Sequence, residues 1–262
     1  MINRFSFRQI AQLSIVVLST WTTKWFYSTA SVDQLRWILW PTTKLVEFVT
    51  GARFIFESRA GYMNNQHTFL IAASCAGVNF LITAFVMLAV RKLWVKRNEQ
   101  IRWRFIPVVA VLAYIATIIT NAVRISLAVQ TLQSQQFNGW LTAGEVHRLE
   151  GILVYFGFLS LLFVVAEQSD RRKAGVDERG VFVSLRRYLY PLSVYYVATL
   201  GVPSLNGAFR QREFWEHLRF VLLIPIVLLI ALASIHWLAM KLSSLRPGRR
   251  LAHPAKLSQA LD

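Results

Sequence analysis

Residues 105–129 read FIPVVAVLAYIATIITNAVRISLAV, an apolar run in which Arg124 is the one charged residue. A helix needs about 20 mostly apolar residues to cross a bilayer, so this run is long enough to span a membrane. Five other stretches have a similar character: 7–27, 74–94, 146–166, 188–203 and 218–240. The sequence therefore predicts an all-α polytopic membrane protein with about six transmembrane helices, the first of them retained.

The composition also favours a membrane protein over a soluble one. Of the 262 residues, 55% are hydrophobic and 16% are charged, whereas soluble domains carry roughly 25% charged residues. A formal net charge of +16 would suggest a nucleic-acid partner in a soluble chain. Here the basic residues lie between hydrophobic stretches and do not gather on one folded surface, so we expect no nucleic-acid partner.

The basic residues fall on one side of the predicted spans. Residues 91–104 and 167–187 hold six Lys or Arg each, and nineteen of the 29 basic residues lie on this face when the termini are included. Because basic loops stay in the cytoplasm, we expect both termini to be cytoplasmic. Residues 1–240 then form a single polytopic domain, followed by a basic, disordered cytoplasmic tail over 241–262. Three connections face outward: 28–66, 130–145 and 204–217.

The first outward connection contains unusual apolar segments. The apolar side chains of residues 35–49 are interrupted by Pro41, Lys44 and Glu47, which favours a helix lying in the membrane interface over a seventh span. Residues 53–58 alternate polar and apolar side chains, a turn-like stretch follows at 60–65, and residues 67–72 are again extended in character. This pattern predicts a short extracytoplasmic β-hairpin before the second span.

Cys75 is the one cysteine of the chain and lies near the outer end of the second predicted span. A single cysteine excludes an internal disulfide and any zinc site built from several cysteines. In the first turn of a helix, the helix dipole would favour the thiolate form of Cys75. The alternative is that Cys75 is a small apolar side chain that fills space in the bundle.

Arg124 lies near the outer end of the third predicted span. Thr117, Thr120, Asn121 and Arg124 follow i, i+3, i+4, i+7 spacing, so they form one polar stripe that should face the bundle and not lipid. The alternative is an arginine whose long side chain extends to the lipid headgroups. The stripe favours a buried and oriented guanidinium.

The fourth predicted span begins with a helix-start signal. Thr142 and Glu145 have the spacing of a capping box, which predicts a helix that starts near Ala143. His147 then lies in the second turn of this helix.

His147 shares a helix face with Glu150 and Gly151. Glu150 could hold the imidazole in one tautomer, and the glycine would allow a helix or substrate to approach closely. The alternative is a solvent-exposed histidine at the interface. His67 and His217 also lie on the outer side, and spacing alone does not choose among the three histidines.

A thiol, a guanidinium and an imidazole from three spans at one depth are suited to acyl transfer. Cys75 would be the nucleophile that attacks a carbonyl, and His147 would be the general acid and base that moves the proton. Arg124 would stabilise the thiolate or the developing oxyanion. This chemistry requires no metal or other cofactor, and we expect none.

The same residues resemble the motifs of the exosortase/archaeosortase family of membrane-embedded cysteine transpeptidases. Cys75-Ala-Gly is similar to its Cys-Ser/Ala-Gly motif and Asn121-Ala-Val-Arg124 to its Asn-x-x-Arg motif. His147-x-x-x-Gly151, with an aromatic pair four residues later, is similar to its His-x-x-x-Gly-aromatic motif. The resemblance covers about residues 50–166. Many members have an arginine shortly after the cysteine motif, where this chain has Val-Asn79-Phe, which resembles a divergent branch called exosortase K.

The resemblance implies a function and a cellular location. Family members recognise membrane-anchored proteins with a C-terminal signal made of a short motif, one transmembrane helix and a basic tail. The implied reaction is cleavage near the motif through a thioester on Cys75, then transfer to an amine acceptor or hydrolysis. The implied location is a bacterial inner membrane, with the active site facing the periplasm. The resemblance also implies supporting roles at the site for Asn121, Glu150, Gly151 and Asn79. The alternative is a transporter or membrane scaffold that binds an anionic solute through Arg124.

Overall fold

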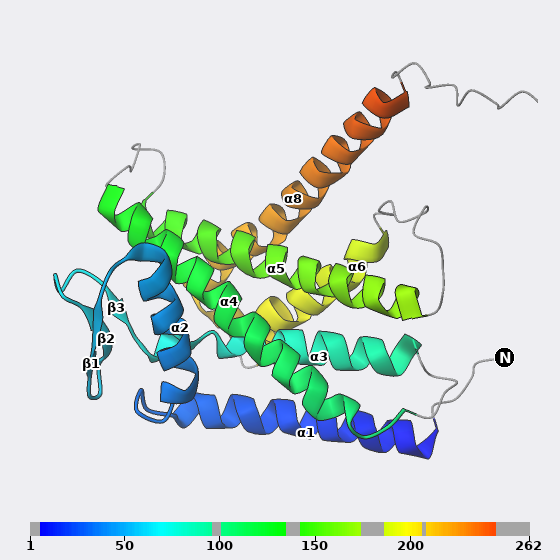
Figure 1. The fold of residues 1–262 in the computed structure, drawn as a ribbon, viewed down its shortest axis with the longest axis horizontal. Coiled ribbons are helices and arrows are strands. Elements are labelled where there is room, and N and C mark those ends of the chain that lie inside the picture. The colour runs from blue at the N-terminus through cyan, green and yellow to red at the C-terminus, as the bar shows by residue number, and fades with distance from the viewer. Residues whose placement is uncertain (1–5, 96–100, 135–141, 174–185, 206–207, 245–262) are drawn as a thin grey trace, which may run out of the picture.

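The computed structural model describes residues 6–95, 101–134, 142–173, 186–205 and 208–244. These residues are mostly helical and include a small three-stranded sheet (Figure 1). The helices are α1 (Phe7–Thr29), α2 (Arg36–Thr50), α3 (Val78–Val95), α4 (Phe105–Ser134), α5 (Ala143–Lys173), α6 (Arg186–Tyr196), α7 (Val202–Leu205) and α8 (Arg212–Ser244). The strands are β1 (Phe54–Glu57), β2 (Gly61–Asn64) and β3 (Leu70–Ile71).

Four helical segments are long and apolar enough to cross a membrane: Ala73–Val95, Phe105–Leu132, Gly144–Asp170 and Phe214–Ala231. They coincide with four of the six spans expected from the sequence. They indicate a membrane-embedded helical protein, and the small sheet precedes the second expected span, where the sequence predicts a short hairpin.

The other two expected spans are not confirmed as spans. The first forms α1, but this helix carries buried polar side chains, including Gln12, whose Nε2 donates to the carbonyl of Ile101 at 3.0 Å. The stretch 188–203 is divided among α6, a π-helical segment at Val197–Gly201 and α7. Of the expected disordered tail, residues 241–244 instead continue α8 because the apolar helix runs past the predicted boundary. The rest of the tail, from residue 245, lies outside the described residues.

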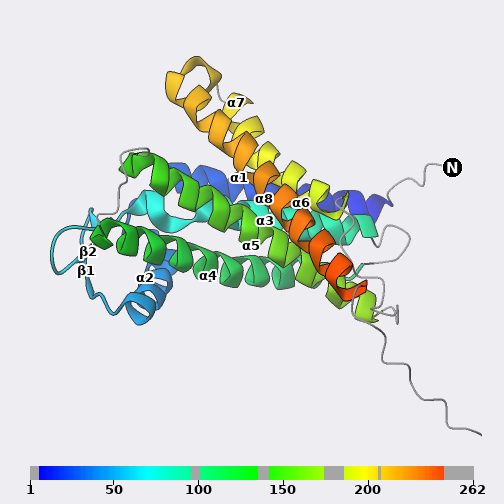
Figure 2. The same ribbon diagram turned by 90° about the horizontal axis from the view of Figure 1, so that it is seen from above.

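Helix α3 lies at the centre of the bundle, in contact with α1, α4 and α5 (Figures 1 and 2). Its small residues Ala84 and Ala89 are fully buried, which lets neighbouring helices approach closely. Larger side chains fill the remaining space, among them Met87 of α3 and Phe156 and Leu159 of α5, each at most 1% exposed. The helix that follows Cys75 is therefore fixed by packing on several sides.

The sheet is antiparallel, with the strand order β1-β2-β3. Gly61, expected in a turn, instead begins β2 with φ +137°, and a side chain there would collide with the carbonyl of Ile71 in β3. The expected hairpin therefore has a third strand. Gly61 allows two strands to approach closely, and the sequence alone does not distinguish such a glycine from one in a turn.

Helix α2 and the sheet lie together at one end of the bundle, which we call the sheet end (Figures 1 and 2). Helix α2 runs crosswise to α1 and α3 in Figure 1, and its place in the membrane interface stays a prediction. Glu47 joins α2 to the sheet, since its carboxylate accepts the N–H of Phe54 at 2.8 Å and the ammonium of Lys44 at 2.6 Å. Partial burial acts to raise the pKa of Glu47, but these hydrogen bonds outweigh it and leave the pKa below its usual value.

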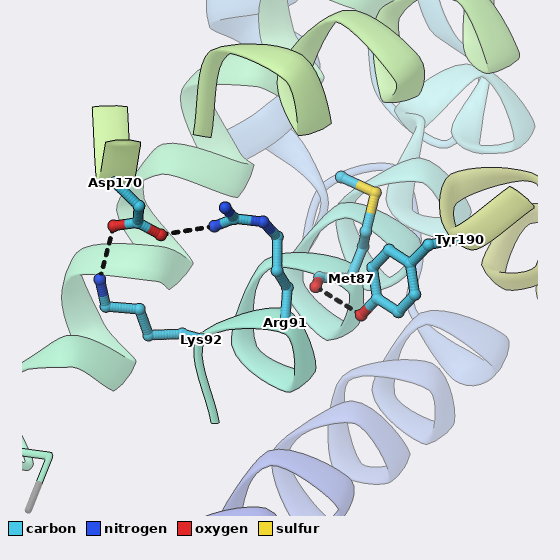
Figure 3. Close-up of polar contacts among 5 residues, drawn as sticks. All are labelled: Met87, Arg91, Lys92, Asp170 and Tyr190. Carbon is cyan, nitrogen blue, oxygen red and sulfur yellow. Dashed lines mark hydrogen bonds and ion pairs between the residues drawn. The ribbon is translucent and has the colours of Figure 1, made fainter. Parts of the chain in front are cut away.

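The opposite end, which we call the basic end, is tied together by an ionic cluster of α3 and α5 (Figure 3). Arg91 and Lys92 of α3 both bond the carboxylate of Asp170 in α5, at 2.6 and 2.9 Å. Tyr190 of α6 donates to the carbonyl of Met87 at 2.9 Å, one turn before Arg91. Arg91 is 9% exposed, so this pairing compensates a nearly buried charge.

Candidate functional site

Cys75 lies at the sheet end in a short 3₁₀ turn, Ala73–Ala76, that precedes α3. Its N–H donates to the carbonyl of Ala72 at 2.9 Å, and the side chain is half-buried. The turn closes at Gly77, whose φ of +72° is left-handed, and α3 begins only at Val78. Cys75 therefore lies in the first turn of the apolar segment Ala73–Val95, as expected, but this turn is a 3₁₀ turn that Gly77 separates from α3.

Asn121 of α4 fixes the Cys75 turn. Its Nδ2 donates to the carbonyl of Cys75 at 2.5 Å, while its Oδ1 accepts the hydroxyl of Tyr155 in α5 at 3.1 Å. The side chain is fully buried, so both hydrogen bonds are shielded from water. A Cβ at Gly77 would lie 3.0 Å from Cγ of Asn121. The glycine is thus required both for its φ angle and for the approach of the amide.

Arg124 lies about one helical turn beyond Asn121 on α4. Its guanidinium carbon is 5.3 Å from the centre of the Tyr155 ring, a cation–π contact. A Cβ at Gly151 would lie 3.9 Å from Cδ of Arg124, so the glycine leaves room for the side chain. Nε of Arg124 is buried and has no hydrogen-bond partner among the described residues. The guanidinium is thus oriented within the bundle with donor capacity left for another group.

The polar stripe of α4 faces the bundle, as expected. Thr117, Thr120 and Asn121 are fully buried, and Arg124 is partly buried. The Thr117 hydroxyl donates to the carbonyl of Ala113 at 2.6 Å, a bond within the helix. The stripe places the amide and the guanidinium on the face that meets the Cys75 turn and α5.

Tyr27 adds a contact from α1 that the sequence did not indicate. Its hydroxyl donates to the carbonyl of Ala73 at 3.5 Å, and it lies within electrostatic range of both Cys75 and Arg124. Tyr155 lies within electrostatic range of the same two residues. The thiol, the guanidinium and two tyrosine hydroxyls therefore form one cluster. A tyrosine near the end of an amphipathic helix is typical of the aromatic belt at a membrane interface. The sequence therefore offers no reason to expect Tyr27 to contact the Cys75 turn.

His147 lies in the second turn of α5, as expected. The capping box is confirmed, since Thr142 Oγ1 accepts the N–H of Glu145 at 3.3 Å and the Glu145 carboxylate accepts the N–H of Thr142 at 2.8 Å. The imidazole is exposed and lies within electrostatic range of Arg124 and Glu150.

The sequence predicts that His147, Arg124 and Cys75 lie at one depth in the bundle, but His147 lies farther toward the sheet end than Cys75. His147 precedes Tyr155 by two turns of α5, which corresponds to about 12 Å along the helix toward the sheet end. The cluster is therefore layered. Asn121 and Tyr155 lie level with Cys75, Arg124 lies one turn farther out, and His147 lies beyond it.

The carboxylate of Glu150 bonds a residue that the sequence reasoning missed. Thr131 of α4 donates its hydroxyl to Glu150 Oε1. This bond ties the ends of α4 and α5 together near His147. Orientation of the imidazole by Glu150 stays a prediction, supported by their electrostatic proximity.

The competing histidines lie in other surroundings. His67 follows β2 with a left-handed φ of +53° and lines a pocket on the sheet. His217 lies on α8 within electrostatic range of Arg148. Among the three histidines, His147 is the one coupled to the guanidinium of the cluster.

Asn79, a supporting candidate, joins α3 to α1. Its Oδ1 accepts a hydrogen bond from the ammonium of Lys24 at 2.8 Å. Lys24 also lies 5.6 Å from the ring centre of Tyr27. Asn79 therefore helps to hold the end of α1 against the start of α3, at the edge of the cluster.

No protein-family model matches the chain, and no curated protein or solved structure matches it either. The described residues contain no group of three or more His, Cys, Asp or Glu side chains that could hold a metal ion.

Proposed function

We propose that the protein is a membrane-embedded cysteine transpeptidase or peptidase that acts on C-terminal sorting signals of other membrane-anchored proteins. The observation that carries the proposal is the double hydrogen bond of Asn121 to the Cys75 turn and to Tyr155. It fixes the backbone of the one cysteine beside an oriented guanidinium, Arg124. The resemblance of the three motifs to the exosortase/archaeosortase family supports the same reading.

The proposed reaction proceeds in two acyl-transfer steps. The Cys75 thiolate attacks the scissile carbonyl, and Arg124, with its unpartnered Nε, stabilises the oxyanion. The intermediate expels the amine, which takes a proton from His147, and leaves a thioester on Cys75. Water or an amine acceptor then attacks the thioester and gives a proton to His147, and the intermediate collapses to expel the Cys75 thiolate. Substrate binding must bring the imidazole and the scissile bond together, since His147 lies two turns beyond Tyr155.

The proposed setting is a bacterial inner membrane, with the basic end in the cytoplasm and the sheet end in the periplasm. Arg91, Arg102 and Arg104 gather at the basic end, which the positive-inside rule places in the cytoplasm. Helix α1 has 23 residues, or about 35 Å, so it is long enough to span as well. With α6–α7 as a further crossing, six spans would leave both termini cytoplasmic.

The orientation is tested with single cysteines introduced into a Cys75→Ala background. We expect an impermeant thiol reagent added to intact spheroplasts to label a cysteine at Ser58 or Thr142. A cysteine at Arg102 or Ser169 should react only after the membrane is permeabilised. The reverse pattern would place the cluster on the cytoplasmic side and refute a periplasmic reaction.

The activity is tested by maturation in cells of a reporter that ends in an extended segment, one apolar helix and an Arg-rich tail. Cys75→Ala should abolish maturation, and Cys75→Ser should be nearly as poor because a hydroxyl is far less ionised than a thiol. Ser74→Ala is the matched control, since Ser74 is the exposed neighbour in the same turn, and it should mature the reporter normally.

The other two roles predict a pattern of losses. Arg124→Lys should be severely impaired if the planar guanidinium stabilises an oxyanion, because an ammonium does not reproduce its geometry. His147→Ala should be inactive while His217→Ala is not. A double variant of Cys75 and His147 should lose little more than either single one.

Membrane levels of every variant are measured to exclude misfolding. Normal maturation with Cys75→Ala would refute the enzyme and favour the alternative, a transporter or scaffold that binds an anionic solute through Arg124.

A further inference from the structure

Strand β1 is the outer strand of the sheet, and its register shows which backbone groups face outward. The N–H of Asn65 donates to the carbonyl of Arg53, so these two facing residues form a hydrogen-bonded pair. Bonded and non-bonded pairs alternate in an antiparallel ladder. Phe54 and Phe56 therefore form non-bonded pairs with β2. Their N–H and C=O groups point away from β2, toward the outer edge of the sheet.

One of these outward groups already binds an acceptor of its own. The N–H of Phe54 donates to the carboxylate of Glu47 at 2.8 Å, which occupies the position that a partner strand would take. The next outward pair belongs to Phe56. In the described residues no strand pairs with β1 on this side. An extended peptide could bond the Phe56 N–H and C=O as an added strand, a common mode of peptide recognition.

The outward face of the sheet offers a place for side chains of such a peptide. Ile55 and Met63 face each other across β1 and β2, and Ile55 is 63% exposed. They line a pocket of 220 Å³ together with Glu57, Asn64, Asn65 and His67. The opposite face carries Phe54 and Tyr62, which are buried against the bundle. The sheet thus combines a pairing edge with an adjoining pocket on its exposed face.

The charges around β1 are mainly basic. Arg53 and Arg59 flank the strand and are exposed, and the guanidinium of Arg36 lies 4.4 Å from the ring centre of Phe56. Glu57 is the one acidic residue within the strand. Glu47 at the edge of β1 is paired with Lys44, so the three guanidinium groups exceed the unpaired acidic charge. This excess favours an acidic partner over a basic one.

We infer that the edge of β1 docks an extended, acidic segment of the substrate by strand addition. This inference rests on the proposed function, because it assigns the docked segment to the protein that is cleaved. Strands lie about 4.8 Å apart, so a peptide on β1 would lie about 14 Å from β3, which ends four residues before Cys75. About four extended residues bridge that distance at 3.3 Å each. The docked segment must therefore be separated by at least about four residues from the bond that is cleaved.

The test uses photo-crosslinking in cells with full-length protein in the Cys75→Ala background, in which uncleaved reporter accumulates. The reporter carries an acidic extended segment before its apolar helix. Benzoylphenylalanine at Ile55 should form an adduct with this reporter, and a reporter with Gln in place of the acidic residues should form less. Benzoylphenylalanine at Ile10, which is 52% exposed on α1 toward the basic end, is the control and should form none.

A charge reversal provides a second measurement with active protein. Arg53→Glu with Arg59→Glu should reduce maturation of the acidic reporter and should be partly rescued by a reporter with a basic segment. Arg102→Glu with Arg104→Glu makes the same change of net charge at the other end and should show no such rescue.

The failure of this inference can be told apart from failure of the proposed function. If Cys75→Ala blocks maturation but Ile55 gives no adduct and the basic reporter gives no rescue, the docking inference is refuted while the enzyme stands. If Cys75→Ala matures the reporter, the proposed function itself fails.

Discussion

The contact of Gly77 with Asn121 makes a quantitative prediction about stability. Alanine at position 77 would adopt φ +72°, and a left-handed conformation costs a non-glycine residue about 1–2 kcal/mol. Its Cβ would also lie 3.0 Å from the Asn121 side chain, which cannot move away without breaking its hydrogen bonds to Cys75 and Tyr155. Overpacking of this kind costs about 1–3 kcal/mol. We therefore expect Gly77→Ala to destabilise the protein by about 2–5 kcal/mol.

Gly51 provides a matched control for the backbone contribution. It has nearly the same φ, +71°, but a Cβ there would meet nothing within 4 Å. Gly51→Ala should therefore cost only the backbone strain of about 1–2 kcal/mol. The measurement is equilibrium unfolding of each variant in detergent micelles. Equal losses for the two substitutions would refute the contact with Asn121 as the reason for glycine at position 77.

Combining Gly77→Ala with Asn121→Ala separates the two contributions further. The double variant removes the steric contact, so its loss should be smaller than the sum of the two single losses. Additive losses would contradict the geometry of the Cys75 turn.

Two further stability predictions concern the ends of the bundle. Asp170→Asn should destabilise the protein by about 1–3 kcal/mol because the nearly buried Arg91 loses its charged partner. Lys92→Gln should cost less, because Arg91 keeps its partner. Equal losses of the two variants in detergent unfolding would contradict this role of Asp170. Because the pKa of Glu47 is lowered by folding, its contribution is present above the ordinary Glu pKa and is lost as the pH falls through the lowered value. When the unfolding temperature is measured from pH 7 downward, the native protein should show this loss and Glu47→Gln should not. Parallel plots of unfolding temperature against pH for the two proteins would contradict the prediction.

The helices were predictable from the sequence, but the details of the site were only partly so. Apolar length located Ala73–Val95 and Phe105–Leu132, and the capping box located the start of α5. The burial of Asn121 followed from helical spacing. These predictions succeeded because they depend on local periodicity, which one segment carries by itself.

The parts that sequence reasoning missed depend on contacts between distant segments. Tyr27 meets the Cys75 turn across 46 residues of chain through Ala73, and the pairing of Asp170 with Arg91 crosses 79 residues. Neither residue has a local pattern that distinguishes it from an interfacial tyrosine or a solvated aspartate. The middle strand, β2, was missed because a glycine in a turn and a glycine in a close strand contact look the same in sequence.

The spacing of the three motifs has a physical explanation in the contacts of this fold. Asn121 and Arg124 are one turn apart on α4, so the amide can bond the Cys75 turn while the guanidinium lies against Gly151. Gly151 is in turn one helical turn after His147 on α5, which places the imidazole just beyond the guanidinium. The order thiol, amide, guanidinium, imidazole thus runs outward from the Cys75 turn. A transporter would instead need polar groups along a path across the bilayer, whereas this cluster is confined to the sheet end. This confinement supports the proposed function, in which the substrate is met at the membrane surface.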